Sequence, residues 1–190
     1  MAGAMQEQQR TEQLPENHLI RVLLLQHERV KELFGRVRGS SGDARQAAFD
    51  DLRELLAIHE TGEEMVLRPI SAKAAGQGVA DARNQEESEA THLLAELEKL
   101  DVGSPEFDEK FRTLEQDVLK HAQSEEQEEF PAVLATHDPI ELQELGGKLL
   151  AAEAKAPTHP HPTAAGSPTA QKSMGPFAAM LDKARDKFKG

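Results

Sequence analysis

Apolar side chains recur three and four residues apart through much of this chain, and this spacing restricts it to long α-helices. The stretch from Ile20 to Val37 shows the pattern clearly, because Leu23 and Val30 fall on one helical face. Breaks that contain glycine, serine or proline divide residues 16–136 into four such segments. The breaks lie at residues 39–42, at Gly76 and Gly78, and at residues 103–105. Four helices with short connections predict an antiparallel up-down-up-down bundle.

Composition agrees with an all-α fold. The 190 residues include no tryptophan and no tyrosine, and β-branched residues are few beside leucine, alanine, glutamate and glutamine. The absence of cysteine excludes disulfides, thiolate zinc sites, iron–sulfur clusters and cysteine nucleophiles. No GxSxG, P-loop, GxGxxG or HExxH motif is present, which argues against hydrolases and nucleotide enzymes.

Charge and hydropathy argue against nucleic acid and a membrane span. The 34 acidic residues outnumber the 22 basic ones and give a formal net charge of −12, so we expect no nucleic-acid partner. No uninterrupted apolar run approaches the roughly 20 residues that a membrane span needs. The first residues lack the basic start and apolar stretch of a signal peptide, which predicts a cytoplasmic protein.

The chain divides into five parts. We expect a disordered N-terminus at residues 1–13, the four-helix bundle at 14–138 and an additional helix at 139–156. Residues 157–175 are rich in proline and threonine, which predicts a flexible linker. Residues 176–190 have the spacing and charge of a short basic amphipathic helix. That helix suits docking on the acidic bundle, which we favour, an anionic membrane surface or a protein partner.

Histidine and glutamate occupy helical positions where apolar residues are expected. His27 is in phase with the apolar stripe of the first segment. The second segment has His59 and Glu63 in its stripe, and the fourth has His121 and Glu125 in the same relation. Each glutamate lies one helical turn after its histidine and on the same face. Two of the four helices therefore carry the same polar interruption of an apolar face.

The third segment is less regular. We take its apolar stripe to be Leu93, Leu97 and Leu100, and His92 lies about one residue, or roughly 100°, from that stripe. His92 is therefore expected on the flank of the buried face rather than at its centre.

The spacing of the four histidines His27, His59, His92 and His121 predicts that they meet. Residues of antiparallel neighbours lie at equal depth when they are equidistant from the turn. The midpoints between successive histidines fall at the Gly42-Asp43 break, beside Gly76 and beside Pro105. One histidine from each helix is thus expected in a single layer of the core.

Such a layer requires a cation. Burying carboxylates and imidazoles without compensation would cost several kcal/mol per ion, more than a small domain can absorb. Nitrogen and carboxylate ligands without thiolate suit iron, manganese or zinc. Glu63 and Glu125 are both able to bridge, which favours two metal ions over one.

These residues resemble the hemerythrin-like, or HHE cation-binding, domain over about residues 14–136. The motif elements are LLLQHERVKELF, LLAIHETGEEMVLRP, ATHLLAEL and VLKHAQSEEQEEFP. The resemblance implies a non-haem di-iron centre with an oxo or hydroxo bridge. In that centre His27, His59, His92 and His121 would be terminal ligands, and Glu63 and Glu125 would be bridges. No catalytic residue is implied beyond the metal ligands.

The chain departs from the dioxygen-carrying hemerythrins in two places. It has Ser88 where they carry a fifth histidine, and a glutamate four residues after the last histidine where they carry an aspartate at five. Two iron positions would then stay open for water, peroxide or a further carboxylate, for which Glu60 is the better candidate and Glu89 the other. The remaining glutamates Glu64, Glu126, Glu128 and Glu129 are predicted to form a solvated acidic face.

Three functions stay open on the sequence. The resemblance implies reaction with hydrogen peroxide, dioxygen or nitric oxide, and an open di-iron pair favours catalase-like peroxide turnover in oxidative stress. A non-enzymatic module that binds or senses dioxygen, iron or nitric oxide is the alternative. The third is an inert structural bundle.

Overall fold

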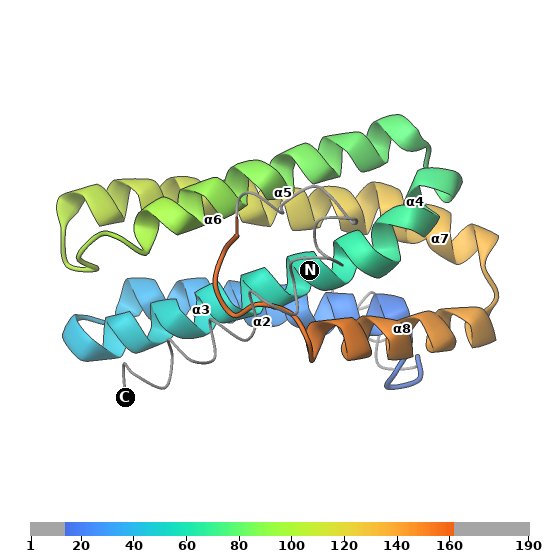
Figure 1. Ribbon diagram of the computed structural model, residues 1–190, viewed down its shortest axis with the longest axis horizontal. Coiled ribbons are helices and arrows are strands. Elements are labelled where there is room, and N and C mark those ends of the chain that lie inside the picture. Colours follow the sequence, from blue (N-terminus) through green and yellow to red (C-terminus); the bar gives the residue numbers. More distant parts are fainter. Residues whose placement is uncertain (1–13, 162–190) are drawn as a thin grey trace, which may run out of the picture.

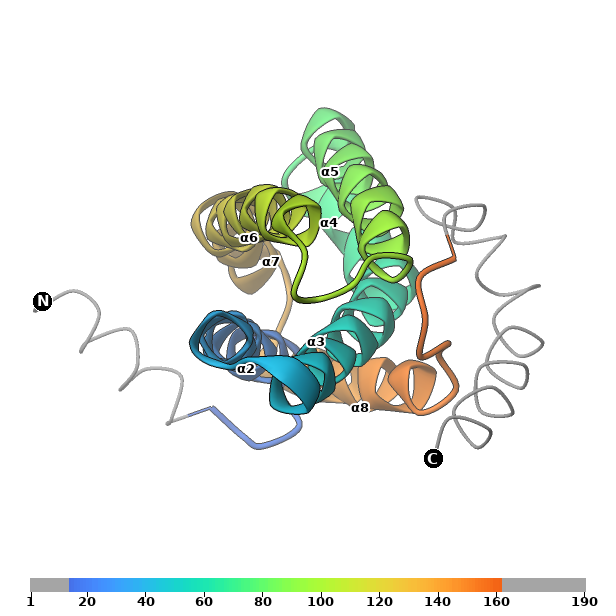
Figure 2. The same ribbon diagram turned by 90° about the vertical axis from the view of Figure 1, so that its left-hand side faces the viewer.

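The computed structural model describes residues 14–161 and is all-α, as predicted (Figure 1). No strand occurs within this part of the chain. The α-helices are α2 (Leu19–Gly39), α3 (Gly42–Gly62), α4 (Arg68–Ala74), α5 (Gln77–Leu97), α6 (Pro105–Ser124), α7 (Phe130–Thr136) and α8 (Pro139–Glu153). Helices α2, α3, α5 and α6 form the antiparallel bundle, which Figure 2 shows end-on. Within residues 14–161, no helix has both the length and the apolar run that a membrane span needs.

Two helices widen into a π-turn in the middle of the bundle. One π segment, Glu63–Leu67, joins α3 to α4, and the other, Glu125–Glu129, joins α6 to α7. Each ends two residues before a proline, Pro69 or Pro131, whose ring nitrogen cannot donate to the preceding turn. Single π-turns inside α-helices are frequent at functional sites. Both of these begin at a glutamate that the sequence places in the core.

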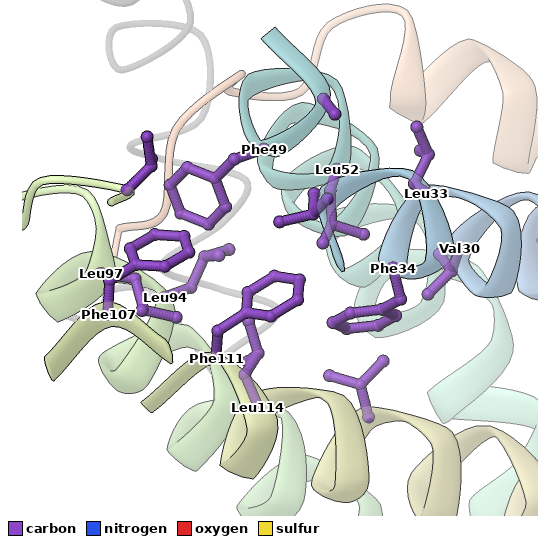
Figure 3. Close-up of a cluster of buried hydrophobic side chains, with 14 residues drawn as sticks. Val30, Leu33, Phe34, Phe49, Leu52, Leu94, Leu97, Phe107, Phe111 and Leu114 are labelled. Carbon is purple, nitrogen blue, oxygen red and sulfur yellow. The ribbon is translucent and has the colours of Figure 1, made fainter. Parts of the chain in front are cut away.

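Two apolar clusters fill the bundle on either side of these π segments. The first lies toward the α2–α3 and α5–α6 turns, and its phenylalanines come from three helices (Figure 3). They are Phe34, Phe49, Phe107 and Phe111. The second cluster joins the start of α2 to the π segment Glu63–Leu67, α7 and α8 through residues such as Leu23, Leu67 and Leu149. On α2, His27 lies between Leu23 of the second cluster and Val30 of the first.

Helix α8 lies within the additional helix expected at residues 139–156 and packs against α2 and α3 (Figure 2). Its approach is close at Gly146, where a Cβ atom would lie 2.0 Å from the carbonyl oxygen of Asn17. Any side chain at residue 146 would therefore push α8 away from the bundle.

The first residues of the expected flexible linker, 157–161, pack on the bundle. Residues 157–161 cross the bundle toward α5, and His159 is buried, with its Nδ1 2.5 Å from Glu98 Oε1. This first part of residues 157–175 is therefore packed, because a histidine with a carboxylate partner can be buried at low cost. Residues 1–13, the rest of the linker and the basic helix expected at 176–190 lie outside the described residues.

Candidate metal centre

Three histidines and two glutamates of the predicted set meet at the centre of the bundle. His27 Nε2 lies 3.3 Å from Glu125 Oε2, and His59 Nε2 lies 3.4 Å from Glu63 Oε1. His121 Nε2 lies 3.3 Å from Glu125 Oε1. Both glutamates are completely buried. Helices α2, α3 and α6 each contribute an inward histidine, and the two π segments contribute the carboxylates.

His92 does not join this group, and the expected layer of four histidines is a layer of three. Its side chain is exposed, and its Nδ1 lies 2.7 Å from the carbonyl oxygen of Ser88 on its own helix. The buried residues of α5 are Ala80, Arg83, Glu87, Thr91, Leu94 and Leu97. His92 follows Thr91 and is therefore turned by roughly 100° out of the core.

Helix α5 contributes Glu87 in place of a histidine. Its carboxylate lies 3.7 Å from His121 Nε2 and is buried. Glu87 is in phase with Leu94 and Leu97, so a stripe drawn through these two leucines would have identified it. A stripe drawn through Leu93 instead turns Glu87 away from the buried face.

The ligand atoms fall into two groups of four that share two carboxylates. One group is His27, His59, Glu63 and Glu125, and the other is Glu63, Glu87, His121 and Glu125. Within each group the atoms lie within 4.8 Å of one another. Glu63 and Glu125 belong to both groups, so the two groups are joined by shared carboxylates.

Of the two further ligand candidates, Glu60 lies beside the centre and Glu89 does not. Glu89 is exposed and accepts a hydrogen bond from Gln85, so the structure places it away from the centre. Glu60 lies beside the centre, where Thr91 Oγ1 donates to its Oε2 at 2.5 Å. It forms a third close group with Glu64 and Glu87.

The expected solvated face is only partly solvated. Glu64 and Glu129 are completely buried, whereas Glu128 is exposed. Glu126 is half-buried and contacts His27. The widened π-turns change which residues face inward, and a regular helical phase does not predict that change.

The outer nitrogen of each inward histidine has a polar partner. The Nδ1 atoms of His27 and His59 lie 2.8 Å from Glu126 Oε1 and Gln26 Oε1, respectively. The Nδ1 of His121 lies 3.0 Å from Glu86 Oε2. A ring N–H given to an oxygen outside the centre leaves the Nε2 lone pair facing inward, which is the usual arrangement of metal-ligating histidines.

The partner of His59 is itself held in place. Gln26 Nε2 donates to Glu153 Oε1 of α8 at 2.8 Å, which turns the amide oxygen of Gln26 toward His59. Helix α8 therefore helps to orient a residue of the centre.

Several inward atoms fit a cation. His27 Nε2, Glu63 Oε1 and Glu125 Oε2 are buried and have no hydrogen-bond partner. All three belong to the first group of four, and they converge from three elements of the bundle. A buried polar atom without a partner is costly, and a bound cation would satisfy all three at once. Imidazole nitrogen and carboxylate oxygen without thiolate suit iron, manganese or zinc.

Comparison with known proteins agrees with this geometry. Residues 18–133 match the family model of the hemerythrin HHE cation-binding domain. The chain belongs to the hemerythrin HHE cation-binding domain family. HHE domains bind metal cations, typically iron, and in this hemerythrin-like chain the buried histidine and glutamate groups are the residues that can hold them.

Two curated relatives and one solved structure are similar to this hemerythrin-like chain. A hemerythrin-like protein of Schizosaccharomyces pombe is 28% identical over 134 residues, which cover 69% of this chain and 66% of that protein. A DNA nickase of Nostoc sp. is 27% identical over 135 residues, which cover 70% of this chain and only 38% of the nickase. The chain thus spans less than two thirds of either relative.

The solved structure shows the fold. It is a hemerythrin HHE cation-binding domain-containing protein from Mycobacterium kansasii, with a TM-score of 0.62 and 24% sequence identity. The match covers 70% of this chain and 83% of that one. The hemerythrin-like bundle assigned from the sequence is thereby confirmed.

A small cavity opens beside the centre of this hemerythrin-like bundle. It has a volume of about 50 Å³. Its lining combines the histidines of both ligand groups and Glu60 with apolar residues such as Val30, Leu94 and Val118. A molecule in this cavity would contact the cation positions and the apolar core together.

Two histidines of the centre, His27 and His121, carry a positive charge when no cation is bound. Burial would lower the pKa of His27, but the neighbouring Glu125 and Glu126 carboxylates outweigh it and raise the pKa to about 9. Burial opposes and the Glu125 carboxylate favours the charged form of His121, and the net result is a pKa well above the usual value. Both imidazoles are therefore protonated at pH 7, whereas a metal ligand must be neutral.

Cation binding is accordingly expected to release protons at pH 7 from His27 and His121, and from Glu87 as well where its carboxyl group, whose pKa burial raises well above the usual value, is protonated. The affinity should rise with pH up to about 9, where His27 loses its proton without help from a metal. Titration calorimetry with Zn²⁺ in buffers of different ionisation enthalpy measures the released protons. A binding heat that does not depend on the buffer would contradict this protonation state.

Proposed function

We propose that this protein is a non-haem iron protein whose centre holds two iron ions and turns over hydrogen peroxide in a catalase-like reaction. The observation that supports it most is the pair of ligand groups that share Glu63 and Glu125 and face one small cavity. His27 and His59 would hold one ion, and His121 and Glu87 the other. When bound, iron supplies the redox couple that converts two peroxide molecules into dioxygen and two water molecules.

The size of the cavity limits the substrate. A single buried water needs roughly 10–15 Å³, so the cavity of about 50 Å³ has room for a ligand of a few atoms. Hydrogen peroxide, dioxygen and nitric oxide are all small enough to fit this space. The apolar wall formed by Val30, Leu94 and Val118 helps to keep bulk water away from the reacting ligand.

Glu60 gives the cavity a proton donor. Burial raises the pKa of its carboxyl group to about 8, so that it is mostly protonated at pH 7. Thr91 Oγ1 holds one carboxyl oxygen at 2.5 Å, and the other, Oε1, is buried and has no hydrogen-bond partner. Peroxide disproportionation moves protons as well as electrons, and Oε1 of Glu60 is placed to give a proton to a ligand in the cavity.

The iron-loaded protein is expected to release one dioxygen for every two peroxide molecules consumed. Glu125→Ala should abolish this reaction, because it removes a carboxylate that both ligand groups share. Glu128→Ala is the matched control, since Glu128 lies on the same π segment but is exposed. An oxygen electrode measures the product directly.

Two results would contradict peroxide turnover. One is a fully iron-loaded protein that consumes no peroxide. The other is saturable binding of dioxygen or nitric oxide without any turnover, which would favour the binding or sensing module instead.

A further inference from the structure

The chain carries two copies of one half-motif. His59, Glu63, Glu64 and Pro69 in the first copy correspond to His121, Glu125, Glu126 and Pro131 in the second. Both copies contain a π segment that begins at the equivalent glutamate. The copies differ just before the proline, where the first has Leu67 and Arg68 and the second has Glu129 and Phe130.

This difference places unlike groups beside the two ligand sets. The Phe130 ring stacks on His27, with ring centroids 5.7 Å apart and an interplanar angle of 18°. The equivalent residue Arg68 instead forms a short ion pair with Glu87 on α5. A stacked pair of rings in one half of the centre is thus replaced by a guanidinium–carboxylate pair in the other half.

Arg68 contacts every carboxylate of the second ligand group. Its Nη2 lies 2.8 Å from Glu125 Oε1 and 3.4 Å from Glu63 Oε2, in addition to the Glu87 contact. Its Nη1 lies 2.5 Å from Glu129 Oε2. The side chain is only 2% exposed, so these four carboxylates surround the guanidinium without water to screen the charge.

The oxygens of the two bridging carboxylates are divided between the halves. Glu63 Oε2 and Glu125 Oε1 face Arg68. Glu63 Oε1 and Glu125 Oε2 face His59 and His27, and neither has a hydrogen-bond partner. The first half of the centre therefore contains no guanidinium, whereas in the second half a guanidinium already contacts the inward carboxylate oxygens.

We propose that Arg68 is a resident cation that occupies the second cation position and makes metal loading sequential. The first metal ion binds to His27, His59, Glu63 and Glu125. A second ion binds to Glu63, Glu87, His121 and Glu125 only when the guanidinium moves away, because both need the same carboxylate oxygens. A guanidinium cannot give up its charge by losing a proton, so it competes at every physiological pH. The proposal deepens the proposed function, because it assigns an order to its two iron positions.

The test replaces one differing residue in each half-motif by the residue at the equivalent position of the other copy. Arg68→Phe combined with Glu129→Leu gives each position the residue of the other copy and leaves the net charge unchanged. We expect wild-type protein to bind one Fe²⁺ tightly and a second at least 100-fold more weakly under anaerobic calorimetric titration. In the double variant the second Fe²⁺ should bind at least 10-fold more tightly than in wild type. Arg68→Lys keeps the charge and should retain a weaker second position.

Wild-type protein alone can overturn the proposal, so the result does not depend on folding of the variant. Mn²⁺ added at one equivalent should give the magnetic resonance spectrum of an isolated ion, and spin coupling should develop only with excess Mn²⁺. Two equally tight ions in wild type would overturn the proposal, as would an unchanged second affinity in a folded double variant. These titrations contain no peroxide, so an absence of turnover would refute the proposed reaction and leave the assigned loading order intact.

Discussion

Replacing His59 by alanine is expected to lower the affinity for the first iron by more than about 100-fold, whereas replacing His92 by alanine leaves it unchanged. Loss of an outer partner of a metal ligand already costs 10–100-fold in affinity, and loss of the ligand itself costs more. His59 presents Nε2 to Glu63 in the buried centre. His92 is exposed on α5 and bonds within its own helix.

The two variants are a matched pair, because each removes one imidazole from a helix of the bundle. Anaerobic Fe²⁺ titration and the metal content after desalting measure the effect. A loss of iron in His92→Ala that equals the loss in His59→Ala would show that α5 supplies a histidine after all. That result would contradict the position of Glu87 in the centre.

The regular helices of the centre were predictable from the sequence. In α2, α3 and α6 the apolar stripe passes directly through His27, His59 and His121, so their inward position follows from spacing alone. In α5 two leucine stripes lie one residue apart, and a stripe through Leu93 instead of Leu94 displaces the predicted buried face by one residue. With this one-residue displacement, His92 is predicted to lie near the core, whereas the residue that is buried there is Thr91.

The charged residues of the second half could not be predicted in the same way. Arg68, Glu87 and Glu129 look like surface residues, because isolated charges of these types are rarely buried. They are buried here because they compensate one another, and that pairing joins positions far apart in the sequence. Helical periodicity cannot report such a pairing. The π-turn before Arg68 also shifts the helical phase that a regular pattern assumes.

Phe111→Ala is expected to lower the free energy of unfolding of the metal-free protein by about 3–5 kcal/mol, the usual cost of removing a buried phenylalanine. Its side chain is 1% exposed. The ring centroid lies 5.4 Å from that of Phe34 and 5.5 Å from that of Phe107, so the change leaves a cavity where α2 meets α6 (Figure 3). The melting temperature should fall by about 10 °C, since each kcal/mol is worth roughly 2–4 °C in a domain of this size.

Metal-free protein is required for this measurement, because a ligand that binds only the folded state adds its own stability. Ile140→Ala is the control, since Ile140 is 71% exposed and its loss should change the free energy of unfolding by less than about 0.5 kcal/mol. Phe111 precedes His121 on α6 by a distance of roughly 15 Å along the helix axis. Folded Phe111→Ala protein should therefore retain its full metal content. A variant that lost stability and iron together would contradict this, because it would show that the aromatic cluster holds the ligands in position and does not simply support the bundle beside them.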